Sequence, residues 1–329
     1  MTGFDHGGGV VNEDTEAEAA DRSRRLNRRN LLLGGGGIAL AVGGFVASAA
    51  TGVIKLNPAL QHSISALGQM PAPVTTTATA VTPVSLVTTS VASVYSHTRG
   101  ANLNLVSFLP AGLAPAKLPV CLLLPGMPGD PRRAMPGLSA ALSAQAANRG
   151  GRPFAVVALD GGENCWHQER PGADPMDVLV DELPAWLSAH GLTGPPVLAA
   201  GIGMGGFDAL LYARRRNERG NPVRAVATIA PGLPTTWPEA SARHTFQGEA
   251  QWAELDPLRH VPALGRTAVG VWCGDRDPDL AGVREFVRLA RPQVADIDRG
   301  GHSAVTFRAT LAGALRFLGT NLPGAHQHA

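Results

Sequence analysis

The chain has 329 residues, including 40 Gly and 26 Pro, and a formal net charge of +2. This near-neutral balance, without basic runs in the body of the chain, argues against nucleic acid as the main partner. The three Cys residues are too few for a disulfide framework and show no zinc-ligand spacing. We therefore expect a globular protein with no metal or other cofactor.

The N-terminal region has the features of an export segment. Residues 27–32 read Asn-Arg-Arg-Asn-Leu-Leu, which is similar to a twin-arginine signal. Residues 31–54 carry no charge and are long enough to span a bilayer, although seven of the 24 are Gly. Ala-Ser-Ala at 47–49 has the small-x-small pattern of a cleavage site. We expect residues 1–55 to be a cleaved export signal or, alternatively, an uncleaved membrane anchor, with the folded part secreted or in the cell envelope.

Composition then separates a linker from a folded domain. Residues 56–84 are rich in Pro, Ala and Thr and have too little large apolar surface to offset the entropy of ordering, so we expect a linker. Residues 85–322 carry the globular patterning and are expected to form one domain. Residues 323–329 are expected to be a disordered tail.

The pattern within this domain predicts its elements in chain order. Alternating apolar and polar residues predict an antiparallel strand pair turned at Arg99-Gly100. Short apolar runs then predict strands buried on both faces of a parallel sheet. The predicted pair is 85–96 and 102–109, and the buried strands are 119–124, 154–159, 197–200, 225–229 and 267–272. The predicted helices are 136–147, 175–190, 204–217, 280–290 and 303–318. This alternation indicates an α/β fold with a mostly parallel, doubly wound sheet and helices on both faces.

The chemistry of such a sheet lies at the carboxyl ends of its strands, and one strand end is especially informative. Residues 199–210 follow the order strand, sharp turn, helix of a nucleophile elbow, whose frame is G-x-S-x-G. Gly201 and Gly205 match the frame. The middle position, where the reactive Ser belongs, is Gly203, which has no Oγ and cannot form an acyl-enzyme.

Two further strand ends supply a candidate acid and base. Asp275 and Asp277 follow the predicted strand 267–272, and His302 lies between the last strand and the last helix. The order elbow, acid, histidine is that of the α/β-hydrolase triad, and either carboxylate is a candidate for the acid. Backbone N–H groups of Met127 and Met204 are candidates for an oxyanion hole.

Other residues offer weaker functional interpretations. Trp166, His167 and Arg170 follow a predicted strand, where they are candidates for substrate binding or for loop packing. Cys165 and Ser303 are alternative nucleophiles, although Ser303 also suits the N-terminus of a helix.

Five segments together resemble a known family. They read LLLPGMPGD, LDGGENCWHQERPGADP, GIGMGGFDALLYA, VWCGDRDPD and GGHSAVTFR. The spaced set is similar to the "Putative esterase" family of α/β hydrolases, which contains esterase D and the mycobacterial antigen 85 mycolyltransferases, and especially to exported actinobacterial esterase-like members. The resemblance implies an α/β-hydrolase fold and ester hydrolysis or acyl transfer between hydroxyls, with Asp277 as the acid, Asp275 as second choice and His302 as the base. Gly203, where the family usually has Ser, and Pro125, where it often has His, depart from the family pattern.

Two functions of different kinds follow. The first is a catalytically degenerate, exported protein that binds a small-molecule or lipid ester, or a cell-envelope component. The second is an active ester hydrolase or acyltransferase that uses His302 and Asp277 with water or an unconventional nucleophile. In both cases we expect membrane contact only through residues 31–54, if these are not cleaved.

Overall fold

A computed structural model describes residues 87–126, 135–148, 151–159, 165–167 and 174–323. The chain divides into two units, Met1–Ala80 and Val81–Ala329, and the first lies wholly outside the described residues. The expected export signal or anchor, the linker and residues 324–329 of the expected tail also lie outside them, as do Met127 and Arg170. Where the structure describes the chain, no helix is both long enough and apolar enough to cross a membrane.

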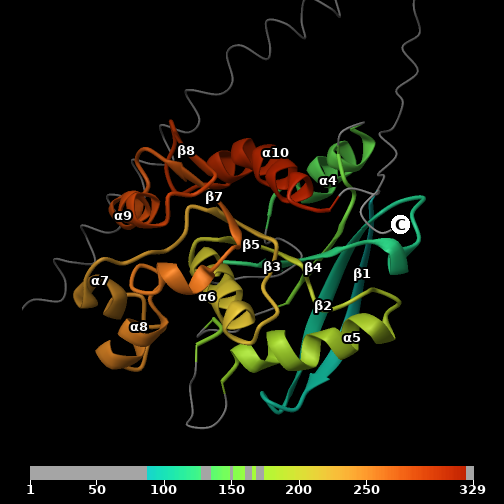
Figure 1. Ribbon diagram of the computed structural model, residues 1–329, viewed down its shortest axis with the longest axis horizontal. Helices are drawn as coiled ribbons and strands as arrows, with labels where there is room; N and C mark the ends of the chain where they lie inside the picture. The colour runs from blue at the N-terminus through green and yellow to red at the C-terminus, as the bar shows by residue number, and fades with distance from the viewer. Residues whose placement is uncertain (1–86, 127–134, 149–150, 160–164, 168–173, 324–329) are drawn as a thin grey trace, which may run out of the picture. The chain divides into compact units, whose positions relative to one another are not determined.

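The described residues form one eight-stranded sheet in the order β1-β2-β4-β3-β5-β6-β7-β8 (Figure 1). β1 and β2 are antiparallel, as predicted, and β2 is also antiparallel to β4, whereas the remaining neighbours are parallel. The strands are β1 (Val87–Ser96), β2 (Ala101–Pro110), β3 (Val120–Leu124), β4 (Ala155–Ala158), β5 (Leu198–Ile202), β6 (Ala225–Ile229), β7 (Ala268–Gly274) and β8 (Val294–Asp298). The predicted mostly parallel sheet is confirmed.

Burial explains why the central strands are apolar throughout. Every residue of β3, β4, β5, β6 and β7 is buried, because helices pack on both faces of the sheet. The edge strand β8 has no fully buried residue, and its sequence VADID accordingly lacks a continuous apolar run.

Two helical layers sandwich the sheet. Helices α4 (Leu138–Ala147) and α10 (Ala304–Thr320) pack on one face, and α5 (Leu183–Ala189), α6 (Met204–Glu218) and α9 (Leu280–Ala290) pack on the other (Figure 1). The predicted helix 175–190 is interrupted, because a π-helical turn (Val178–Glu182) precedes α5. Two short helices that the sequence did not predict, α7 (Trp237–Ser241) and α8 (Glu249–Leu255), lie between β6 and β7 in the chain.

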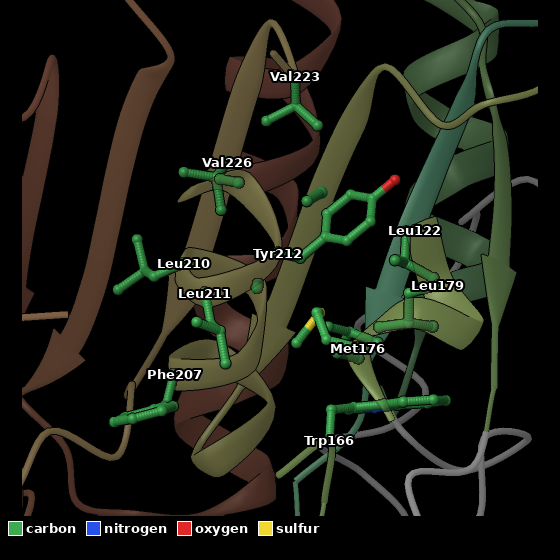
Figure 2. Packing of buried hydrophobic residues seen from close by; sticks show 14 of the residues in the cluster. Leu122, Trp166, Met176, Leu179, Phe207, Leu210, Leu211, Tyr212, Val223 and Val226 are labelled. Carbon is green, nitrogen blue, oxygen red and sulfur yellow. The ribbon is translucent and has the colours of Figure 1, made fainter. Parts of the chain in front are cut away.

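Helix α6 runs through the core. Every residue from Met204 to Ala213 is buried. Figure 2 shows Phe207, Leu211 and Tyr212 of α6 among apolar side chains of the sheet and of the segment that carries Trp166. A helix packed in this way holds its N-terminus, and the strand end before it, in a fixed position.

Candidate active site

The turn between β5 and α6 is a sharp elbow. Gly203 joins the two elements with φ +56° and ψ −126°, a backbone conformation that glycine adopts more readily than residues with a side chain. Its carbonyl oxygen accepts hydrogen bonds from the backbone N–H of Gly206 at 2.9 Å and of Gly232 at 2.8 Å. Gly203 therefore stands at the tip of a strand–turn–helix motif, as the sequence predicted.

The two frame glycines are required by close backbone approach. A Cβ atom on Gly201 would collide with the carbonyl oxygen of Gly205, and one on Gly205 would collide with that of Leu124. The chain can form this elbow only because both positions lack side chains.

The candidate acid and base are in contact. His302 Nδ1 lies 2.9 Å from Asp277 Oδ2, and the Asp277 side chain is fully buried. Asp277 Oδ1 accepts a further hydrogen bond from the Asp279 N–H at 3.0 Å, which helps to orient the carboxylate. Asp275 is exposed and instead accepts from the Gly300 N–H at 3.0 Å. Of the two carboxylates that the sequence left open, Asp277 is the one that contacts the histidine.

This contact sets the protonation of the histidine. The hydrogen bond to Asp277 raises the pKa of His302 above its ordinary value, and the negative charges of Asp277 and Asp279 act in the same direction. Partial burial and the positive charge of Arg243 oppose the rise in this pKa. His302 therefore holds its proton more readily than a free imidazole does.

The other ring nitrogen of His302 faces the elbow. A Cβ atom built on Gly203 would lie 3.4 Å from His302 Nε2 and 4.0 Å from the Gly126 Cα. A side chain at position 203 would thus point at the base, which is the relation between nucleophile and base in a triad. The structure brings Asp277, His302 and Gly203 together, with the Met204 N–H at the start of α6 beside them. The other predicted oxyanion donor, Met127, lies outside the described residues, next to Gly126.

Arg243 and Asp279 form an ion pair next to this site, which the sequence did not predict. Arg243 Nη1 also lies 3.6 Å from the Met204 Sδ. Asp279 stands two residues beyond Asp277 and could have been noticed for that reason, whereas nothing in the local sequence marks Arg243. The pair forms part of the wall of a hollow of about 290 Å³, which Leu233 and Gly282 also line.

Three side chains of this network could in principle share a metal ion. Asp277, Asp279 and His302 each offer one ligand atom within 4.8 Å of the others. Asp277 is already bonded to His302, however, and Asp279 is paired with Arg243. We therefore interpret the cluster as a hydrogen-bonded network.

Comparison with known proteins identifies the family. The family described as "Putative esterase" matches residues 96–318. This chain belongs to that family. No curated protein matches the chain.

Solved structures share the fold of this esterase-family chain. A ferulic acid esterase is 20% identical, with a TM-score of 0.60 over 72% of this chain and 99% of that one. An S-formylglutathione hydrolase from Agrobacterium tumefaciens is 17% identical, with a TM-score of 0.59 over 73% and 97%. The Staphylococcus aureus S-formylglutathione hydrolase is 15% identical, with a TM-score of 0.57 over 70% and 98%. At these identities the likeness establishes the α/β-hydrolase fold.

Two predicted substrate-binding residues lie inside this esterase fold. Trp166 and His167 are each only 1% exposed. The guanidinium of Arg99 lies 4.7 Å from the Trp166 ring centroid, and His167 lies 3.0 Å from Asp208. Both side chains occupy the protein interior and do not face open space, because the aromatic rings pack into the core around α6. The third predicted residue, Arg170, lies outside the described residues.

The side chains of both alternative nucleophiles are engaged in other contacts. The Ser303 hydroxyl accepts a hydrogen bond from the Thr306 N–H and caps α10. Cys165 is only 4% exposed, and its thiol is hydrogen-bonded to Asp208. Neither side chain therefore takes the place of a nucleophilic serine at position 203.

Proposed function

We propose that this chain is a catalytically silent esterase-family protein that binds a ligand at the site around Gly203 and works outside the cytoplasmic membrane. One observation carries the proposal: the position that faces His302 Nε2 at the elbow is a glycine. In serine hydrolases, loss of the nucleophile lowers turnover on the order of a million-fold. The ligand classes that the family resemblance favours are a small-molecule or lipid ester and a cell-envelope component.

The proposed location rests on the N-terminal sequence. The Arg pair at 28–29 and the uncharged residues 31–54 support export, with the leader either removed or kept as an anchor. Replacement of Arg28 and Arg29 by Lys should leave the protein in the cytoplasm, as measured by fractionation and immunoblotting. Unchanged export of the doubly substituted chain would contradict the twin-arginine interpretation.

An ester assay tests the proposed loss of catalysis. The full-length wild-type chain, Gly203→Ser and Gly203→Ala are compared on p-nitrophenyl butyrate. We expect only the serine variant to turn over, because alanine adds the same Cβ without an oxygen. Wild-type turnover at ordinary enzyme rates would contradict the proposal, and so would an inactive serine variant with an unchanged melting curve.

A second candidate function is hydrolysis by an activated water. The contact between His302 and Asp277 at 2.9 Å favours it, because that pair can act as a general base without a serine. Slow wild-type turnover that disappears in His302→Ala would support this candidate. Turnover that survives His302→Ala would rule it out.

A further inference from the structure

The side-chain space above Gly203 is bordered by unpaired hydrogen-bonding groups. His302 Nδ1 is engaged by Asp277, whereas Nε2, on the Gly203 side of the ring, has no partner among the described residues. The His302 side chain is 37% exposed, so ligands can reach it. In an esterase of this family the serine hydroxyl would fill this space and interact with Nε2.

A second donor lies at the same turn. Met204 is the first residue of α6, so its N–H has no carbonyl partner within the helix. No hydrogen bond joins it to an acceptor elsewhere in the described part of the chain, whereas the N–H groups of Gly206 and Phe207 both donate to the Gly203 carbonyl. In an elbow of this form, the N–H after the nucleophile position is directed at the reacting group.

The charges around His302 determine what can bind there. Asp277 and Asp279 each carry a negative charge, and Arg243, which pairs with Asp279, carries one positive charge. With His302 protonated these four groups sum to zero, and with His302 neutral they sum to −1. The hydrogen bond to Asp277 raises the pKa of His302 and so favours the protonated form. In that form Nε2 presents an N–H toward the space above Gly203.

We propose that this space binds the carboxylate of an organic acid, with one oxygen accepting from protonated His302 Nε2 and the other from the Met204 N–H. The inference rests on the proposed function, and it changes the ligand class from an ester to a free acid. A carboxylate offers two charged acceptors to these donors, whereas a neutral ester or amide offers weaker ones.

A binding experiment on the full-length wild-type chain tests this. The probes are straight-chain carboxylates from acetate to octanoate and their matched primary amides, titrated by calorimetry at pH 5.5 and pH 8.5 in EDTA. We expect at least one acid to bind about tenfold or more tightly than its amide at pH 5.5. Binding should weaken as the pH rises, because His302 loses its proton.

Three variants locate the site. His302→Gln removes the charged donor, and Gly203→Ser fills the space, so each should weaken acid binding about tenfold or more. Asp275→Asn, which changes an exposed carboxylate beside the same loop, should leave it unchanged. Melting curves check that each variant is folded.

Several results would overturn the inference. The inference fails if no acid binds, or if each acid and its matched amide bind equally well. It also fails if the affinity for the acid does not decrease between pH 5.5 and pH 8.5. It fails equally if neither His302→Gln nor Gly203→Ser changes that affinity. Because no ester is used, failure here is distinct from failure of the proposed loss of catalysis, which the ester assay measures.

Discussion

The molecule contains two histidine–aspartate pairs of nearly equal length in different surroundings. His302 lies 2.9 Å from Asp277 with its side chain 37% exposed, whereas His167 lies 3.0 Å from Asp208 with both side chains almost fully buried. Both pairs adjoin α6, because Gly203 precedes the helix and Asp208 lies in its second turn. Distance alone therefore does not distinguish a site for chemistry from a structural contact.

The second ring nitrogen makes the difference. His302 Nε2 faces the space above Gly203, whereas His167 Nδ1 donates to the Thr245 carbonyl at 3.1 Å. Since a carbonyl can only accept, Nδ1 of His167 carries a proton. The contact between Nε2 and Asp208 then needs a second proton, which is held either by Nε2, making the ring charged, or by a neutral Asp208. Burial raises the pKa of Asp208 and favours the neutral form. The buried pair joins the segment of His167 to α6 and leaves no ring nitrogen for a ligand.

The largest effect is expected when the His302–Asp277 pair is broken in a catalytically active variant. In the Gly203→Ser chain, Asp277→Asn should lower kcat by about a thousandfold to ten-thousandfold, because the histidine loses the partner that orients it. Asp275→Asn is the matched control and should change kcat little. Steady-state kinetics on p-nitrophenyl butyrate measures both variants. Equal losses in the two would contradict the assignment of Asp277.

The buried pair should matter for stability. His167→Ala should lower the free energy of unfolding by about 3–5 kcal/mol, because it removes a buried aromatic ring that packs on Phe207 and Phe246 and leaves the buried Asp208 without its partner. His302→Ala should lower it by less than about 1 kcal/mol, since His302 is partly exposed. Urea denaturation measures both variants. Similar losses would remove the distinction between the two pairs.

The smallest expected effect is on pH dependence. In the Gly203→Ser chain, His302 must be neutral to accept a proton, so kcat/KM should be retained above its pKa and lost as the pH falls through it. Since Asp277 and Asp279 raise this pKa, the midpoint should lie above the ordinary value of about 6.5. Asp279→Asn should move the midpoint downward. A midpoint at or below the ordinary value would contradict the role given to these carboxylates.

The sequence predicted the parts of the fold whose signals are local. The central strands are continuous apolar runs because both faces of the sheet are covered, and the elbow is marked by glycines that close backbone approach requires. The edge strand β8 was not given bounds, because a half-exposed strand such as VADID lacks such a run. Helices α7 and α8 were not predicted, since each is only one or two turns long.

The candidate site was predictable to a similar extent. Gly203, Asp277 and His302 follow strand ends in the order of a known motif, and so could be located from sequence. Arg243 comes from the segment after α7, and only tertiary structure brings it to Asp279. The burial of His167 likewise depends on Phe207 and Phe246, which pack against its ring from other parts of the chain.

Fluorophosphonate labelling tests the central claim that only the nucleophile is missing from this esterase site. The reagent transfers its phosphonyl group to an activated serine oxygen and releases fluoride, and intact-mass spectrometry counts the groups added. We predict one group on Gly203→Ser and none on the wild-type chain or on Gly203→Ala. Labelling of the wild-type chain, or none on a folded Gly203→Ser chain, would contradict the account.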